Sequence, residues 1–343
     1  MNQRPAFISA PLGPELQRLI KSYRELAPWT WMLPDDLFGW RHPEKELIGY
    51  CTVQGGQGSY PGLMILKDCL PTYEELVEEE ISPQEPMGMV KLAGVSLQFI
   101  PRKDAGPEAL EAFDRLDIIW PFPDEIPFVQ VLEPGWLPQA YLTEEGQELL
   151  TYGLYHSLAM AERIQVEVDL LENTAAGISS ILLRWPQQSL SEPTWEDRWV
   201  SQQDLTNPDS LTNVDTLYVR SNAEGLPTQD EAWWADSFFV PQVTIEESTG
   251  KPYLPRVMLL LDGASGDWID HKLGSPNDWP GMLQYLLVKN FLKQGYLPSA
   301  IWVIRQETYR YLYPICQALN IQLQMHPNRE VLTGVKEALF GKF

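Results

Sequence analysis

The stretch PRVMLLLDGASGDWIDHKLG, residues 255–274, is the part of the sequence that decides the fold. Five apolar residues run without a break from Val257 to Leu261, and Asp262 and a glycine-rich turn follow them. A short, unbroken apolar run that ends in turn residues is typical of a buried strand. The stretch therefore predicts two strands joined by a tight turn, with Asp262 at the end of the first strand.

The sequence after this hairpin alternates between helix and strand patterns. Gly295 suits the end of the first helix, because glycine readily takes the left-handed conformation that ends many helices. The expected elements are a helix over 281–295, a strand over 299–304, a helix over 308–319, a strand over 321–325 and a closing helix over 328–339. This β-β-α-β-α-β-α order predicts an α/β domain over residues 251–343.

The N-terminal half has a different pattern. Over residues 1–165, helices are expected at 12–26 and 143–164, with strand patterns between them at 46–53, 63–66, 95–100 and 128–132. This order predicts an α+β domain with a partly antiparallel sheet. Residues 166–250 are polar, carry short strand patterns at 178–185 and 216–220, and are expected to form a connector.

Four glycines lie close together in CTVQGGQGSYPGLMILKD, residues 51–68: Gly55, Gly56, Gly58 and Gly62. Such a loop either cradles a phosphate or turns the chain between two strands. A phosphate-binding Walker loop needs a lysine followed by serine or threonine and then a helix. This stretch has no lysine in that place and continues into the strand-like LMILKD. A hairpin loop with positive φ angles is therefore the preferred interpretation.

The composition restricts the partners of the chain. Its 343 residues include 47 acidic and 25 basic residues, which gives a net charge of −22. The negative electrostatic field of this charge repels nucleic acid and anionic membrane surfaces. No apolar run is long enough for a membrane span, and the N-terminus lacks the apolar core of a signal peptide. The three cysteines lack the spacing of a disulfide framework or a zinc site. We therefore expect a cytoplasmic protein whose partner is another protein, not a membrane or a nucleic acid.

Asp262, Asp267 and Asp270 are the candidate ligand or metal residues. Asp262 would lie at the end of a buried strand, and such edges of α/β sheets often hold ligands and metal ions. The alternative is that Asp262 accepts hydrogen bonds from backbone amides of its own turn, as aspartate commonly does, while Asp267 and Asp270 face solvent. No residue stands out as catalytic, and no cofactor is expected.

The strand, aspartate, glycine turn and second strand resemble the opening hairpin of RNase H-like nucleases and integrases. PSAIWVIRQETYRYLYPICQALNIQLQMHP, residues 298–327, resembles the later strand, helix and strand of an integrase core. Where an integrase core would carry its second aspartate, this sequence has Arg305 and Gln306, with Glu307 displaced. Two-metal chemistry needs several converging carboxylates, and an arginine repels the metal ions. The resemblance therefore implies a catalytically silent relative of that fold.

Tryptophan is plentiful, with 13 residues in the chain. Trp29, Trp31, Trp40, Trp233 and Trp234 are candidate interface residues, because tryptophan often anchors protein interfaces. For Trp29, Trp31 and Trp40, the alternative is that they form a local core. Since no complete catalytic set is present, the leading hypothesis is a non-enzymatic protein-binding or scaffold protein. The alternative hypothesis is a metal-dependent phosphodiesterase or nuclease with a degenerate site at Asp262.

Motifs at both ends of the chain resemble a group of uncharacterised bacterial proteins, largely from cyanobacteria. The N-terminal motifs are WTWMLPDDLFGW at 29–40 and IGYCTVQGGQGSYPGLMIL at 48–66. The C-terminal motifs are PRVMLLLDGASG at 255–266 and LPSAIWVIRQETYRYLYPICQALNI at 297–321. The resemblance implies an N-terminal domain with a glycine turn and an RNase H-like C-terminal domain, and it implies no established activity.

Overall fold

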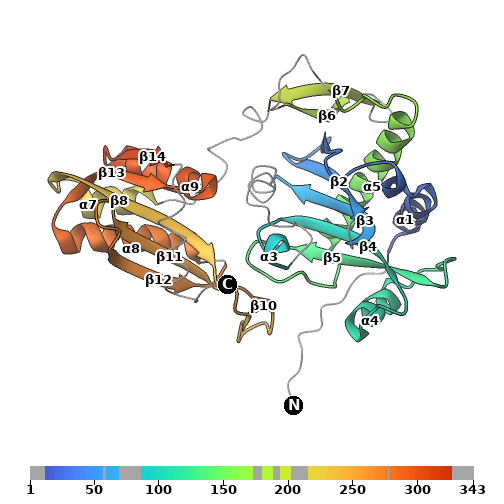
Figure 1. Cartoon of the computed structure of the whole chain (residues 1–343), viewed down its shortest axis with the longest axis horizontal. Coiled ribbons are helices and arrows are strands. Elements are labelled where there is room, and N and C mark those ends of the chain that lie inside the picture. The colour runs from blue at the N-terminus through green and yellow to red at the C-terminus, as the bar shows by residue number, and fades with distance from the viewer. Residues whose placement is uncertain are drawn as a thin grey trace. The chain divides into compact units, whose positions relative to one another are not determined.

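The computed structural model describes residues 12–56, 59–68, 86–172, 180–187, 194–201, 215–276 and 278–326. The chain forms two compact units (Figure 1). The first unit comprises Met1–Asn207 and Glu247–Gly250, and the second comprises Pro208–Glu246 and Lys251–Phe343. Within the described residues, no helix combines the length and the apolar character that are needed to cross a bilayer.

A seven-stranded sheet forms the centre of the first unit, in the order β5-β4-β3-β2-β1-β6-β7. Neighbouring strands are antiparallel, except that β1 and β6 pair in parallel. The expected α+β class with a partly antiparallel sheet is therefore confirmed. The strands are β1 (Phe38–Arg41), β2 (Ile48–Gly56), β3 (Ser59–Lys67), β4 (Gly94–Pro101), β5 (Glu125–Leu132), β6 (Ser180–Gln187) and β7 (Thr194–Ser201).

Two long helices, α1 (Pro14–Leu26) and α5 (Glu144–Ile164), pack against each other beside this sheet (Figure 1). The apolar residues of α1 recur at three- and four-residue spacing, so one side of the helix is buried. At the start of α5, the Thr143 hydroxyl accepts a hydrogen bond from the Gly146 N–H at 3.0 Å, which caps the helix. The shorter helices are η1 (Pro28–Thr30), α3 (Pro86–Met89) and α4 (Pro107–Leu116).

Alternating side chains of the sheet bury two apolar layers. In β3, Leu63 and Ile65 belong to the core that contains the residues of α1 and α5. Their neighbours Met64 and Leu66 belong to a separate core that contains Tyr50. This alternation follows from the two-residue period of a strand, and it explains why the apolar run of β3 is continuous.

The second unit has a five-stranded sheet in the order β12-β11-β8-β13-β14. Strand β11 is antiparallel to both of its neighbours, whereas β8, β13 and β14 run parallel. The strands are β8 (Thr228–Phe239), β11 (Arg256–Asp262), β12 (Trp268–Gly274), β13 (Leu297–Val303) and β14 (Gln322–Met325), and β9 (Thr244–Ile245) and β10 (Pro252–Tyr253) form a separate small ribbon.

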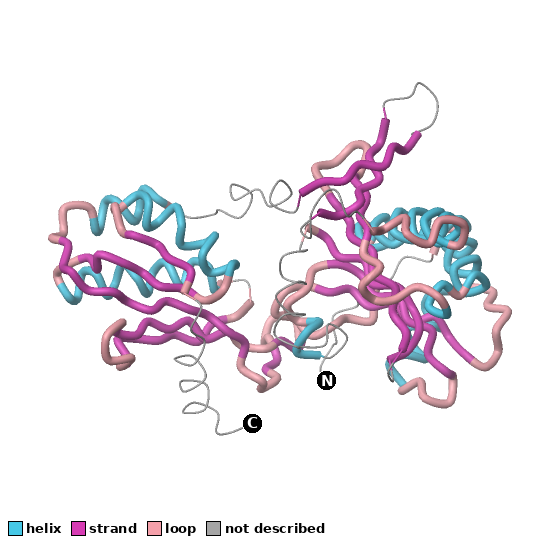
Figure 2. The backbone as a smooth tube through the Cα atoms, turned by 45° about the horizontal axis from the view of Figure 1, so that its top comes forward, coloured by secondary structure: helices cyan, strands magenta, loops and turns pink. Residues whose placement is uncertain are grey.

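The described helices of this unit cover one face of the sheet (Figure 2). They are α7 (Thr216–Ala223), α8 (Trp279–Gln294) and α9 (Gln306–Ala318), and their buried residues share one core with β8, β11 and β13. The expected α/β class is confirmed, as is the β-β-α-β-α-β order from β11 to β14. The closing helix expected over 328–339 lies outside the described residues.

Two assignments between residues 166 and 250 need correction. The strand expected over 216–220 is wrong, because these residues form α7, in which Asp215 caps the N–H of Tyr218 at 2.9 Å. The residues of TLYVR favour a strand by their local propensity. The cap at Asp215 and the burial of Val219 and Ala223, which lie four residues apart on one helix face, outweigh that preference. The sequence analysis also missed β8, which is the central strand of the second sheet.

The segment expected as a connector supplies elements to both units. Strands β6 and β7 complete the first sheet through the parallel pairing of β6 with β1. Helix α7 and strand β8 belong to the second unit, where β8 pairs with β11 and β13. Much of 166–250 is therefore integral to one sheet or the other.

Candidate functional site

The carboxylate of Asp262 is used within its own hairpin turn. Its Oδ1 accepts hydrogen bonds from the N–H groups of Ala264 at 3.0 Å and Ser265 at 2.7 Å. The hydrogen bond from the Ser265 backbone is the main cause that lowers the pKa of Asp262, because it stabilises the charged form. The structure therefore matches the turn interpretation of this residue.

The other two candidate aspartates have different surroundings. Asp267 is exposed, and its backbone N–H bonds to the Ser265 hydroxyl at 3.1 Å. Asp270 accepts hydrogen bonds from two side chains of α8, Lys289 at 2.8 Å and Asn290 at 3.0 Å. In the part of the chain that the structure describes, no three His, Cys, Asp or Glu side chains are grouped to hold a metal ion. The fold does not bring the three aspartates together as a ligand set.

A different pair of charges lies where β8 and β13 approach their carboxyl ends. Asp236 of β8 is buried, with 2% of its side chain exposed, and Arg305 lies two residues after the end of β13. The Arg305 guanidinium forms an ion pair with Oδ2 of Asp236 and donates to the Ser237 carbonyl at 3.1 Å. The Thr308 hydroxyl donates to Oδ1 of Asp236 at 3.3 Å. Both oxygens of this buried carboxylate are therefore satisfied from within the chain.

A second ion pair extends this arrangement. Arg256 donates to both oxygens of Glu307, at 3.1 and 2.5 Å, and to the Ser237 hydroxyl at 3.1 Å. Its guanidinium also lies 3.8 Å from the ring centre of Trp279, a favourable cation–π geometry. A bidentate arginine–carboxylate pair fixes both side chains strongly. We call Asp236, Arg256, Arg305, Glu307 and Thr308 the sheet-edge network.

The sheet-edge network is electrically neutral, with two arginines and two carboxylates. A divalent cation at a sheet edge requires several carboxylate oxygens that can face it. Here Asp236 already faces Arg305, and Glu307 faces Arg256. Arg305 was expected to oppose metal binding, whereas its partner Asp236 was not among the predicted site residues. If EAWWADSFF, residues 231–239, had been predicted as a strand parallel to 297–303, Asp236 and Arg305 would have been expected to lie close together.

The five candidate tryptophans differ in exposure. Trp31 is exposed, at 37% of its surface, and Trp29 is half-buried against the rings of Tyr23 and Phe99. The other three tryptophans are buried within their own units and therefore cannot contact a partner protein; they are Trp40, Trp233 and Trp234.

The glycine-rich stretch forms the hairpin between β2 and β3, as expected, with Gly56 paired to Ser59. Gly55 has a φ of 129°, a conformation that L side chains rarely adopt. Gly62 lies within β3, where a Cβ atom would stand 2.0 Å from the Leu97 carbonyl oxygen of β4. Gly62 therefore permits close strand packing, and Gly58 lies outside the described residues.

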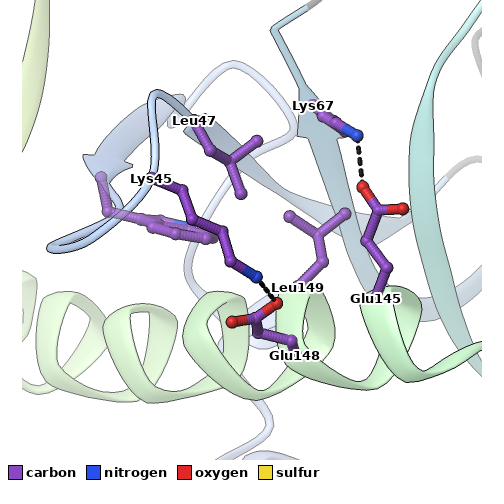
Figure 3. Close-up of a pocket in the computed structure, with 7 residues that line it drawn as sticks. Lys45, Leu47, Lys67, Glu145, Glu148 and Leu149 are labelled. Atoms are coloured by element: carbon purple, nitrogen blue, oxygen red, sulfur yellow. Dashed lines mark hydrogen bonds and ion pairs between the residues drawn. The ribbon is translucent and has the colours of Figure 1, made fainter.

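A hollow of about 280 Å³ lies between the sheet and α5 of the first unit (Figure 3). Trp40, Leu47 and Leu149 form its apolar lining, and two lysine–glutamate pairs flank it. This hollow could not be expected from the sequence, because the partners of its two ion pairs lie 103 and 78 residues apart. No local motif marks such a site.

The comparisons with known proteins give little beyond domain matches. No curated protein matches the chain. A cryo-EM structure of a simian T-cell lymphotropic virus intasome in complex with PP2A regulatory subunit B56 gamma matches 35% of this chain, at 16% identity and a TM-score of 0.23. The chain spans 42% of the matching chain of that structure. A TM-score this low does not establish a shared fold.

Two domain families match separate parts of the chain. Residues 14–184 match a family described as "Domain of unknown function (DUF7309)". Residues 221–340 match a family described as "Domain of unknown function (DUF6930)". The matched regions do not overlap, and neither description assigns a function to the region that it matches.

Proposed function

We propose that this chain is a non-enzymatic cytoplasmic protein that binds another protein, as a scaffold or assembly component. The observation that carries the proposal is the sheet-edge network. At the edge where an α/β sheet would bind a metal ion or substrate, the chain places its own arginines against Asp236 and Glu307. A unit whose sheet edge is closed in this way is suited to act through its outer surface.

In this proposal the second unit is a catalytically silent RNase H-like domain, and the chain belongs to a largely cyanobacterial group of bacterial proteins. The antiparallel meander of β8, β11 and β12, continued by parallel β13 and β14, supports the RNase H-like fold alone. The position of Arg305 weighs against the alternative, a metal-dependent phosphodiesterase or nuclease. Asp262 gives that alternative no support, since its carboxylate is bound to its own turn.

The outermost strand β12 offers a surface for such a partner. Within the described residues β12 pairs with β11 alone, so its other edge has backbone groups that can pair with an added strand. Trp268 and Leu273 of this strand are 40% and 55% exposed. Exposed tryptophan is the kind of residue that carries binding energy in protein interfaces.

Affinity capture from native lysate at low salt tests the binding role. The wild-type chain is expected to retain a stoichiometric partner, and Trp268→Ala or Trp31→Ala is expected to release it. Ile119→Ala is the matched control, because Ile119 is 96% exposed in the first unit and lies outside both candidate surfaces. Recovery of no stoichiometric partner, or equal loss with the control, would count against the proposal.

A metal titration tests the alternative. The chain is incubated with Mn²⁺ or Mg²⁺ and with single-stranded and structured nucleic acids, and cleavage is followed by gel electrophoresis. We expect no metal-dependent cleavage from the wild-type chain. Cleavage that requires the metal and disappears in Asp262→Asn or Asp236→Asn would establish the enzymatic alternative instead.

A further inference from the structure

Two lysine–glutamate pairs span the hollow of the first unit (Figure 3). Lys45 lies between β1 and β2, and Lys67 ends β3. Their partners, Glu148 and Glu145, lie three residues apart on α5. Each pair therefore joins the sheet side of the hollow to the helix side, and both glutamates project from the same face of α5.

A buried histidine holds one of these carboxylates in position. His42 is 3% exposed, and its Nδ1 accepts hydrogen bonds from the N–H groups of Glu44 at 3.0 Å and Lys45 at 3.1 Å. The ring proton is thereby left on Nε2, which donates to Oε1 of Glu148 at 3.2 Å. Oε2 of Glu148 pairs with Lys45. The hydrogen bond from buried His42 therefore fixes the orientation of the Glu148 carboxylate, as supporting residues do in binding sites.

The lining of the hollow is apolar and its size is small. Trp40, Leu47 and Leu149 are buried residues that face it, and Figure 3 shows Leu149 between the two ion pairs. A volume of about 280 Å³ is slightly below the usual range for ligand sites, about 300–1,000 Å³. The occupant must therefore be small and have an apolar part.

The charges around the hollow select the class of ligand. Lys45 and Lys67 are 51% and 40% exposed, so water competes with each pair and the pairs can open at little cost. An anion that binds a lysine leaves the neighbouring glutamate beside another negative charge. A cation that binds a glutamate leaves the neighbouring lysine beside another positive charge. A group that carries both charges can enter an open pair and give each side chain a new partner.

We propose that this hollow binds a small zwitterion with an aliphatic side chain, that is, a free α-amino acid of the size of leucine. The carboxylate of the ligand pairs with Lys45 and its ammonium group pairs with Glu148. The aliphatic side chain packs on Leu47 and Leu149. This site lies in the first unit and is independent of the protein-binding surface on β12.

Isothermal titration calorimetry of the full chain tests this proposal, with L-leucine as the probe. Three analogues separate the contributions: 3-methylbutylamine lacks the carboxylate, 4-methylpentanoate lacks the ammonium group, and glycine lacks the aliphatic side chain. We expect saturable binding of leucine and affinities at least about tenfold weaker for each analogue. Equal binding of the amine or the acid would overturn the zwitterion requirement.

Variants locate the binding. Glu148→Gln and Lys45→Met are each expected to weaken leucine binding at least about tenfold, and Glu148→Gln keeps an oxygen for His42. Leu47→Phe is expected to abolish binding by filling the hollow without changing its charge. Glu25→Gln is the matched control, since Glu25 forms an exposed pair with Lys21 on α1. Absence of saturable binding at about 10 mM leucine, or binding unchanged in all three variants, would refute the proposal.

Discussion

Replacing Arg305 with methionine is expected to destabilise the second unit specifically. The substitution keeps much of the side-chain length but removes the guanidinium that pairs with Asp236. Arg305 is 11% exposed and Asp236 is 2% exposed, so water cannot readily replace the lost partner. The variant therefore leaves a buried carboxylate with an uncompensated charge.

The magnitude follows from the burial of this pair. Removing one partner of a buried ion pair costs about 3–5 kcal/mol, because the desolvation of the remaining charge is no longer offset. A pair at the surface sets the comparison: Arg198 and Glu196 of β7 are 45% and 44% exposed at 2.9 Å, and Arg198→Met is expected to cost less than about 1 kcal/mol. The two substitutions are chemically identical and differ in burial.

Native-state hydrogen exchange followed by mass spectrometry is the suitable assay, because it reports on each unit separately. A chain of two units need not unfold in one step, so a single melting temperature would mix their stabilities. In Arg305→Met, amides of β8 and β13 are expected to exchange roughly 10²- to 10⁴-fold faster, while those of β2 and β3 do not change. Adding Asp236→Asn is expected to recover part of the loss, since the two residues act as a pair.

The reasoning fails if Arg305→Met costs no more than Arg198→Met. It also fails if amides of both units exchange faster to the same extent, since the damage would then not arise from the sheet-edge network. A double variant whose loss equals the sum of the single losses would show that Asp236 and Arg305 do not depend on each other.

Three further predictions concern the first unit. Gly62→Ala is expected to cost about 1–3 kcal/mol by forcing β3 away from the Leu97 carbonyl, measured as a lower urea midpoint of the first unit. Burial, with the nearby Arg184 charge, lowers the pKa of His156 to about 2, so the folded chain holds the neutral ring while the unfolded chain takes up a proton below about pH 6.5. Stability is therefore fully present above that pH and falls as the pH drops, by about 3 kcal/mol at pH 4.5, and His156→Gln should flatten this dependence in acid unfolding curves. Burial also raises the pKa of the Cys51 thiol to about 12, so iodoacetamide at pH 8 is expected to label Cys51 in urea but not in the native chain.

The fold class could be predicted because most elements have strong local patterns. The run from Val257 to Leu261 and the period of α1 each fix an element without reference to the rest of the chain. Strand β8 could not be recognised in the same way. Trp233 packs in the helix-covered core and Trp234 packs in the core of the opposite face, so this central strand lacks the alternation of a half-buried strand.

The candidate site was harder to predict than the fold. The unsuitability of Arg305 for metal binding could be stated from the sequence, but its partner Asp236 lies 69 residues earlier, in a segment interpreted as a connector. The exposure of the tryptophans could not be predicted from the sequence either. A sequence gives the number of large aromatic residues but not their exposure, and Trp233 and Trp234 serve the interior of the second unit.

Burial decides which ion pairs of this protein are structural and which can exchange partners. Asp236 is 2% exposed, and a ligand that displaced Arg305 would have to repay the desolvation of both charges. Glu145 is 66% exposed, and its pair with Lys67 already competes with water, so a ligand that carries both charges can separate the two side chains at little cost. The sheet-edge network therefore closes this edge of the second sheet to small charged ligands, whereas the charged rim of the first-unit hollow can open to a zwitterion.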